Sequence, residues 1–277
     1  MNRVHNFYSV LEETMVAEAE ARGIELIVQD GDFDSSKQKN QIEDFIVQEV
    51  DAIIVCPVDS ASIGGPIGMA NEAGIPIFTA DIGADEGEVV AHIATDNVMG
   101  GRLAGEFLAE QIGGEGKVVI LDHPSVMSVQ DRTSGFEAAM AEYPGIDIVD
   151  RPAADGVRDK ANDRMQDMLT KYPDLDGVFA INDDTALGAL AAIRQSTEPL
   201  EDLVMVGFDG TAEALEEIEA GSHLKADVVQ YPTEIAKQTI DAVHTYLEGD
   251  LEWALGDPTL VIPIEPELVT ADDLPLE

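Results

Sequence analysis

Short apolar runs alternate with longer amphipathic stretches along the whole sequence, and this alternation is what most constrains the fold. Runs with the length and composition of buried strands are Ile24–Val28, Ala52–Cys56, Ile75–Thr79, Val118–Leu121, Ile146–Val149, Val178–Ile181, Val204–Phe208 and Ala226–Val229. Stretches with helical periodicity lie between them, such as Val98–Ile112, Val129–Tyr143, Thr185–Gln195 and Thr233–Glu248. Apolar strands that alternate with helices predict an α/β fold, with parallel sheets covered by helices on both faces.

The strand–helix units are more than one compact sheet holds, so we expect two doubly wound parallel-sheet lobes. A length of 277 residues allows two domains, and hydrophobic residues at 45% provide for a substantial core. No low-complexity linker is present in the sequence. This indicates lobes joined by several short crossings rather than by one tether.

The composition is strongly acidic, because 56 Asp and Glu against 15 Lys and Arg give a net charge of −41. Such a surface repels nucleic acid and anionic membranes, since both are bound through clustered cations. The acidic residues are spread along the chain and do not form a tail. We therefore expect a halophilic protein whose self-repulsion is screened by concentrated salt.

Two features that resemble reactive or metal sites have simpler interpretations. Cys56, the single cysteine, lies in an apolar run and is expected to be a small buried hydrophobe. The loop Asp30–Asp34 has the alternating acids of a calcium loop, but Ser35 and Gln41 stand where that loop has Gly and Glu. The five His residues show no metal-ligand spacing. We expect no metal and no cofactor.

Polar side chains follow several of the predicted strands, at the point where each strand ends. These are Asp81, Asn182, Asp209 and Gln230. In open α/β sheets ligands bind at the carboxyl ends of the strands, so this set is expected at a ligand-binding edge. Carboxylates accept hydrogens from hydroxyl groups and amides both donate and accept, which suits a neutral polyhydroxyl ligand. The alternative is that these residues cap the helices that follow them.

Three further residues complete this candidate site. Arg132 is expected to supply donors that complement the carboxylates. Phe7 and Tyr8 are expected to cover the apolar C–H face of a sugar ring. No recognisable catalytic or cofactor motif accompanies these residues, so we expect a binding protein and not an enzyme.

Three stretches carry a family resemblance: Gly87–Gly101, Val178–Leu190 and Val206–Thr211. In this order and spacing, the chain resembles the periplasmic sugar-binding proteins of the ribose-binding type over nearly its whole length. The resemblance implies a type I periplasmic binding protein with three hinge crossings. Its lobes are then 1–95 plus 231–265 and 96–230 plus 266–277. It also implies a monosaccharide or cyclic polyol held in the interlobe cleft of a monomer, for ATP-driven import through a membrane permease.

The resemblance also assigns site residues one by one. The ring-stacking aromatics are Phe7 and Tyr8, the pocket wall is Phe208, and the polar contacts are Asp81, Arg132, Asn182, Asp209 and Gln230. Three departures alter the pocket: His5 replaces a family asparagine, Ile82 an arginine, and Gly156 lies near the place of a stacking phenylalanine. His5 is retained as a ligand candidate. Losing an arginine fork and one ring face leaves open a pentose, a hexose, a deoxysugar or a polyol.

The start of the sequence departs from the family pattern, which has an apolar strand before the first helix. Here Met1–His5 leads almost directly into Phe7 and the helix around Leu11–Ala21. No signal peptide and no membrane span is visible in this sequence. A missing central strand leaves backbone groups unpaired, so we expect upstream coding sequence that holds the strand and an export signal. The expected location is extracytoplasmic, either periplasmic or at the cell surface through a lipid anchor.

A second function class shares this two-lobed core. Sugar-responsive repressors of the lac type have similar Asn-Asp and Gly-Phe-Asp segments, but they need a basic helix-turn-helix headpiece that is not present here. The segment Gly207–Thr211 looks more like the transport branch. A repressor core without its headpiece remains the alternative, and the sequence upstream of Met1 discriminates between the two.

Overall fold

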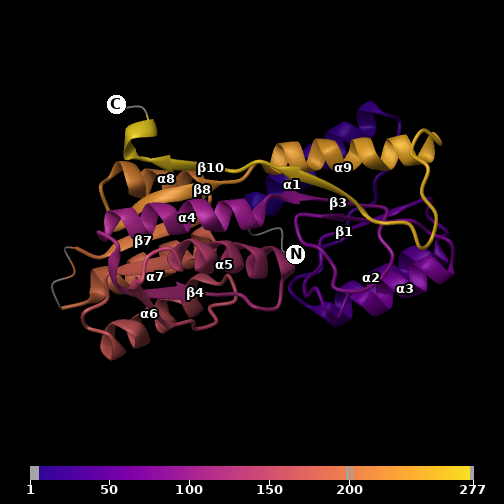
Figure 1. Cartoon of the computed structure of the whole chain (residues 1–277). Helices are drawn as coiled ribbons and strands as arrows, with labels where there is room; N and C mark the ends of the chain where they lie inside the picture. Colours follow the sequence, from indigo (N-terminus) through magenta and orange to yellow (C-terminus); the bar gives the residue numbers. More distant parts are fainter. Residues whose placement is uncertain (1–5, 198–199, 201, 275–277) are drawn as a thin grey trace. The chain divides into compact units, whose positions relative to one another are not determined.

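The computed structural model describes residues 6–197, 200 and 202–274, and the chain divides into two compact units (Figure 1). Unit 1 comprises Met1–Thr95, Ser125–Ser128 and Tyr231–Ile264. Unit 2 comprises Asp96–Pro124, Val129–Gln230 and Glu265–Glu277. Each unit has a sheet of its own, and the fold is α/β with parallel sheets, as the sequence predicts.

Unit 1 is built on a four-stranded parallel sheet with the order β1-β2-β3-β9. Its elements are α1 (Asn6–Ala21), α2 (Ser35–Val47), β1 (Ile53–Val55), α3 (Gly64–Glu72), β2 (Ile77–Ala80), β3 (Ala91–Thr95), α9 (Pro232–Leu247) and β9 (Leu260–Ile264). Alternate side chains of the strands enter two cores, one on each face of the sheet. Phe78 packs with α1 and α9, whereas its neighbour Ile77 packs with α2 and α3.

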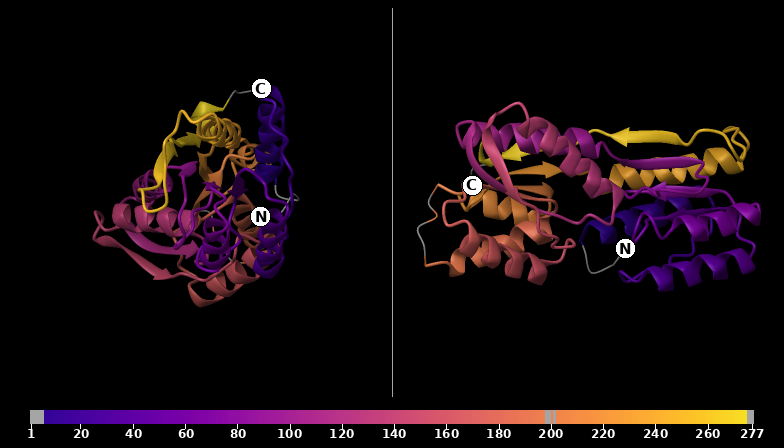
Figure 2. Two further views of the ribbon diagram at one scale, coloured as in Figure 1. Left: turned by 90° about the vertical axis from the view of Figure 1, so that its right-hand side faces the viewer. Right: turned by 60° about the horizontal axis from the view of Figure 1, so that its bottom comes forward.

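Unit 2 is built on a six-stranded sheet with the order β10-β8-β7-β6-β4-β5, in which only β10 is antiparallel to its neighbour. Figure 2 shows the ribbon from two further sides. The strands of unit 2 are β4 (Glu115–Leu121), β5 (Gly145–Asp150), β6 (Gly177–Ala180), β7 (Val204–Asp209), β8 (Leu224–Val229) and β10 (Glu267–Thr270). Its helices are α4 (Asn97–Gln111), α5 (Met127–Met140, whose first two residues group with unit 1), α6 (Arg158–Lys171), α7 (Asp183–Gln195), α8 (Ala212–Glu219) and the short 3₁₀ turn η1 (Ala271–Asp273).

The two faces of the unit 2 sheet are both buried. On one face, Val178 of β6 packs with side chains of α6, α7 and α8. On the other face, the ring of Phe179 stacks on that of Phe136 from α5, with centroids 4.5 Å apart and planes 6° apart. Both phenylalanines are fully buried. Burial on both faces explains why the strands read as continuous apolar runs.

Helices α4 and α5 approach each other closely because each contributes a glycine to the crossing. A Cβ built on Gly101 would lie 1.8 Å from the carbonyl oxygen of Arg132, and one on Gly135 would lie 2.0 Å from that of Val98. Real side-chain atoms do not approach a carbonyl oxygen this closely. The two glycines therefore fix the position of α5, and with it the position of Arg132.

One predicted strand is not a strand in the structure. Ile24–Val28 runs without regular secondary structure, and no described strand pairs with it. The composition of this run is that of a strand, but a strand also needs a hydrogen-bonded neighbour. In the other direction, β9 and β10 were not predicted, because Pro263 interrupts the apolar run of β9, and β10 has only two apolar residues between Glu267 and Thr270.

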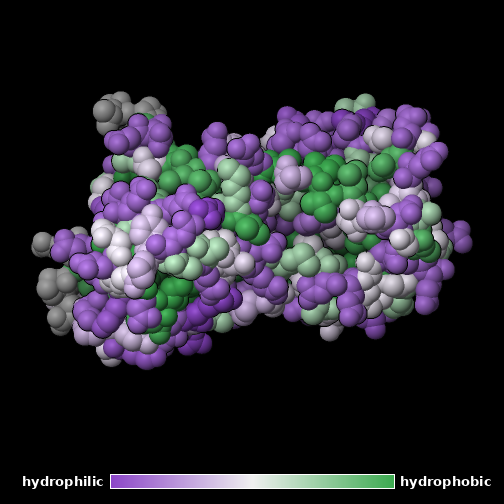
Figure 3. All heavy atoms as spheres, viewed as in Figure 1, coloured by the Kyte–Doolittle hydropathy of each residue, from purple (hydrophilic) through white to green (hydrophobic). Residues whose placement is uncertain are grey.

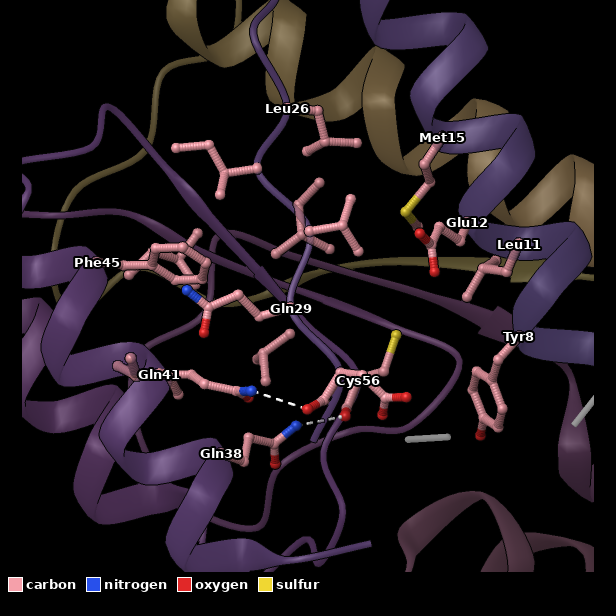
Figure 4. A pocket seen from close by; sticks show the side chains of 17 residues that line it. Tyr8, Leu11, Glu12, Met15, Leu26, Gln29, Gln38, Gln41, Phe45 and Cys56 are labelled. Carbon is pink, nitrogen blue, oxygen red and sulfur yellow. Dashed lines mark hydrogen bonds between the residues drawn. The ribbon is translucent and has the colours of Figure 1, made fainter. Parts of the chain in front are cut away.

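A groove in unit 1 separates this unpaired segment from β1 (Figure 4). It has a volume of about 150 Å³ and is lined by α1, α2, residues 26–30 and residues 53–56. Among the described strands, β2 alone pairs with β1. Ile27 and Val28 are 46% and 37% exposed, which is unusual for consecutive branched aliphatic residues.

Hydrophilic residues cover most of the face of each unit seen in Figure 3, as the acidic composition predicts. In the part of the chain that the structure describes, no helix has both the length and the apolar character needed to span a membrane.

Candidate functional site

In unit 1, the predicted residues Tyr8 and Asp81 are joined directly. The hydroxyl of Tyr8, in the first turn of α1, donates to Oδ2 of Asp81 at 2.7 Å. Asp81 directly follows β2, is 4% exposed and has a φ of 65°, a left-handed conformation that Asp tolerates better than most residues. Phe7 packs edge-on against Tyr8, with centroids 5.2 Å apart, and is itself buried in the core between α1 and α9.

In unit 2, Arg132 is the centre of a buried hydrogen-bond network. Its Nε donates to Oδ1 of Asn97 at 2.8 Å, and its Nη1 donates to the carbonyl oxygen of Ile181 at 2.7 Å. The same Nη1 lies 3.4 Å from Oδ1 of Asp209. The guanidinium stands over the ring of Phe208, with Cζ 3.8 Å from the centroid, so a cation–π interaction holds its other side.

Asp209 and Gln230 come from the ends of the neighbouring strands β7 and β8. The Gln230 side chain donates to Oδ1 of Asp209 at 2.6 Å, and the Gln230 backbone N–H donates to the Asp209 carbonyl at 3.2 Å. Asp209 has a φ of 123°, a conformation that L residues seldom adopt. Side chains of opposite charge and of both hydrogen-bonding types are thus gathered at this edge of the sheet.

Asn182 has a helix-capping role that the sequence left open. Its Oδ1 accepts from the backbone N–H of Thr185 at 2.9 Å and from the Thr185 hydroxyl at 2.6 Å, which caps α7. Its Nδ2 makes no hydrogen bond to another described residue and lies 3.2 Å from where a Cβ on Gly156 would be. Near that position is also His123, whose pKa is lowered by burial, so its imidazole is neutral at pH 7. The amide donor of Asn182 is therefore available beside an uncharged ring.

The structure brings Arg132, Phe208, Asp209 and Gln230 together in unit 2, and Phe7, Tyr8 and Asp81 together in unit 1. His5 lies outside the described residues, and Ile82 is buried at 2% exposure.

The sequence reasoning missed Asn97, the Ile181 carbonyl, and the two buried acids Asp183 and Asp227. The sequence contains one sign of a buried acid, because Asp227 lies inside the otherwise apolar predicted strand Ala226–Val229.

The acidic loop around Asp30 has ordinary structural tasks. Oδ1 of Asp30 accepts from the backbone of Asp32 at 2.8 Å, and Asp34 caps α2 by accepting from Ser36 and Lys37. Within residues 6–197, 200 and 202–274, no group of three His, Cys, Asp or Glu is arranged to hold a metal ion. The loop therefore serves as the N-cap of α2.

The polar cluster of unit 2 is close to electrically balanced, because Asp209 offsets the charge of Arg132. It has no surplus of cations for a phosphate or carboxylate ligand. A family model described as a periplasmic binding protein domain matches residues 2–251. The chain belongs to the periplasmic binding protein family. The predicted resemblance and the type I fold are thereby confirmed, and this is a family of substrate-binding proteins, not of enzymes.

Relatives of this periplasmic binding protein are named for sugars and polyols. The ribose import binding protein of Bacillus subtilis is 37% identical over 244 residues, which are 88% of this chain and 78% of that protein. The xylitol-binding protein of Mycolicibacterium smegmatis is 30% identical over 93% of this chain and 73% of its own length. The Caulobacter myo-inositol binding protein, solved with myo-inositol, has a TM-score of 0.89 at 27% identity, over 98% of this chain and 91% of its own. These relatives do not favour the alternative of a regulator core.

Proposed function

We propose that this protein is the solute-binding component of an ATP-driven importer and that it captures a neutral monosaccharide or cyclic polyol. The observation that carries this proposal is the charge-balanced cluster of Arg132, Asp209 and Gln230 beside the ring of Phe208. Carboxylate and amide groups hydrogen-bond to hydroxyls, and an aromatic wall suits the C–H face of a sugar. The names of the relatives support the same ligand class.

We assign ligand contacts to residues of each unit. In unit 2 they are Arg132, Asn182, Phe208, Asp209 and Gln230, and in unit 1 they are Phe7, Tyr8, Asp81 and His5. The lobes of a hinged binding protein are proposed to be 1–95 plus 231–265 and 96–230 plus 266–277, which differ from the two units only at Ser125–Ser128 and Glu265. The protein is proposed to work as an extracytoplasmic monomer that delivers its ligand to a membrane permease.

Neutral sugars and polyols are expected to raise the melting temperature of the protein. A ligand that binds only the native state stabilises it by about 2.7 kcal/mol at a concentration one hundred times the dissociation constant. A thermal-shift screen in 1 M KCl with D-ribose, xylitol, D-apiose, D-allose and myo-inositol measures this effect. Ribose 5-phosphate is the charged control. A panel without any shift, or a shift only with the phosphate, would refute the proposed ligand class.

The acidic surface is proposed to be an adaptation to high salt. With a net charge of −41, repulsion among surface carboxylates opposes folding in dilute buffer, and salt screens it. The melting temperature is expected to fall markedly between 2 M KCl and 20 mM buffer. Circular dichroism at equal pH measures the change. Equal melting temperatures in the two conditions would exclude this role for the acids.

The groove between residues 26–30 and β1 is proposed to be filled by a strand encoded upstream of Met1. The same upstream sequence is proposed to encode an export signal. Met15 lies toward the Leu26 end of the groove and Tyr8 toward the Cys56 end (Figure 4). A strand running parallel to β1 would therefore end near Tyr8, where α1 begins. Such a strand would form backbone hydrogen bonds with the segment Ile24–Val28 on one side and with β1 on the other. An in-frame stop codon immediately before the Met1 codon would rule this out.

A further inference from the structure

Two carboxyl groups are completely buried in unit 2, next to Asp209 but not in its hydrogen-bond network. Asp183 is the first residue of α7 and is 1% exposed, and Asp227 lies within β8 and is 0% exposed. Burial of an ionised carboxylate is costly unless it is paired with a cation or fully hydrogen-bonded. Two such groups side by side need a specific explanation.

Each of the two carboxyls uses one oxygen to hold the turn that follows Asp209. Oδ2 of Asp183 accepts from the backbone N–H of Thr211 at 2.7 Å, and Oδ1 of Asp227 accepts from that of Gly210 at 2.9 Å. This turn includes the positive φ values of Asp209 and Gly210, 123° and 76°. The carboxyl pair therefore stabilises a turn in which Asp209 has a conformation that L residues seldom adopt.

The remaining oxygens of the pair lie close to one point, beside Gly207. Asp183 Oδ1 and Asp227 Oδ2 are buried, and no described residue donates a hydrogen bond to either. Both lie against Gly207, because a Cβ built there would be 2.3 Å from Asp227 Oδ2 and 3.3 Å from Asp183 Oδ1. Two ionised carboxylates in this arrangement repel each other strongly, whereas one shared proton satisfies both oxygens.

We propose that Asp183 and Asp227 share one proton across Gly207, and that this protonated pair is the clamp that positions Asp209. The glycine is needed because any side chain at position 207 would occupy the space of the shared hydrogen bond. Asp183 and Asp227 are positioning residues for the ligand-binding carboxylate, and this positioning role rests on the proposed function. The shared proton does not depend on a ligand.

Neighbouring charges do not remove the need for the proton. The pair faces the carboxylate of Asp209 on β7, which opposes ionisation, and the guanidinium of Arg132 on α5, which favours it but is already bound to Asp209, Asn97 and Ile181. The other charged groups nearby on α7, α8 and β8 have partners of their own: Asp184 and Glu213 bind Arg158, and Lys225 binds the carbonyls of Gly221 and Ser222. Burial, as the largest cause, raises the pKa of Asp183 well above its usual range and that of Asp227 to about 7.

The proton makes folding pH-dependent in a defined direction. The unfolded carboxyls titrate near pH 4 and the folded pair at a higher pH, so between these two values the folded state holds the shared proton, which the unfolded state has lost. The stabilisation is complete below pH 4 and is lost as the pH rises through the folded pKa. The equilibrium constant for folding is expected to fall about tenfold per pH unit in this window through the pair alone.

Asp227→Asn tests the proposal because it replaces the shared proton by an amide N–H, which donates a hydrogen bond but does not titrate. Its Oδ1 still accepts from Gly210, and its Nδ2 donates to Asp183 Oδ1 at every pH. Urea unfolding in 1 M KCl is measured from pH 5 to pH 7 for the wild type, for Asp227→Asn, and for Asp163→Asn, which removes an exposed carboxylate of α6. The ratio of the folding constants of Asp227→Asn and wild type is expected to rise about tenfold per pH unit, whereas Asp163→Asn stays parallel to the wild type. Parallel profiles of Asp227→Asn and wild type would overturn the proposal.

Infrared spectroscopy of the native protein provides the second measurement, which does not require a variant to fold. At pH 6 ordinary surface carboxyls are ionised, so a carboxylic acid C=O band reports a shared or protonated buried acid. The band is expected in the wild type and in Asp163→Asn, and it is expected to disappear in Asp227→Asn and in the reciprocal Asp183→Asn. A wild-type spectrum without this band at pH 6 refutes the shared proton, and leaves the proposed sugar binding untouched.

Discussion

Asp209→Ala is expected to abolish sugar binding while unit 2 remains folded. The carboxylate is proposed to accept hydrogen bonds from ligand hydroxyls, and each hydrogen bond to a charged group contributes about 1.5–3 kcal/mol. Two lost bonds of this kind correspond to an affinity loss of at least about a hundredfold, because about 1.4 kcal/mol is a factor of ten. Asp209 is the last residue of β7 and lies outside the apolar core of unit 2, so the packing of this core does not depend on it.

Asp209→Asn is the matched variant for this prediction. Asn tolerates the positive φ of 123° better than Ala, and its Oδ1 can still accept from Gln230 and Arg132. Binding is measured by calorimetry with the panel member that gives the largest thermal shift, and folding by circular dichroism. We expect no detectable binding for Ala and weakened binding for Asn. Wild-type affinity of a folded Asp209→Ala protein would contradict the assignment of Asp209 to the ligand.

Gly135→Ala is expected to destabilise the protein strongly. The new Cβ would lie 2.0 Å from the carbonyl oxygen of Val98, so α4 and α5 must move apart. Overpacking of this kind typically costs about 1–3 kcal/mol of unfolding free energy, and contact with rigid backbone places this case at the upper end. Because Arg132 lies one turn before Gly135 on α5, the displacement is also expected to weaken sugar binding.

Gly68→Ala is the control, because Gly68 is also in a helix but no atom lies within 4 Å of its added Cβ. This variant is expected to be more stable than the wild type by about 0.4–1 kcal/mol, since alanine restricts the unfolded chain. Urea unfolding of both variants measures the difference. If Gly135→Ala were as stable as Gly68→Ala, the proposed tight crossing of α4 and α5 would be wrong.

Much of the fold could be predicted from the sequence, because both sheets are covered on both faces. The run Val178–Ile181, which overlaps β6, is apolar at every position for this reason, and the pattern identifies such strands without a structure. Strand β9 escaped prediction because it is an edge strand: Leu260 and Val261 are 43% and 61% exposed, and Pro263 interrupts the run. Ile24–Val28 shows the opposite error, since composition predicts a strand but pairing decides whether one forms.

The candidate site was predictable where it depends on strand ends and unpredictable where it depends on side-chain geometry. Asp209 and Gln230 follow neighbouring parallel strands, so their meeting follows from topology. The partners of Arg132 could not be predicted from topology. The Asn97 side chain comes from another helix, and the Ile181 carbonyl is a backbone group without a sequence signature. The contact of Asp183 with Asp227 depends on a glycine in a third element, which no spacing rule anticipates.

The discontinuous unit 1 sets an order of events on the ribosome. All strands of unit 2 except β10 lie before Tyr231, whereas unit 1 needs α9 and β9, which are translated later. The nascent chain can therefore complete most of unit 2 while the first 95 residues still wait for their last helix and strand. Domains usually mature from the amino terminus onward during translation. Here we expect the reverse, so the amino-terminal third of the polypeptide is the part that stays exposed to chaperones longest.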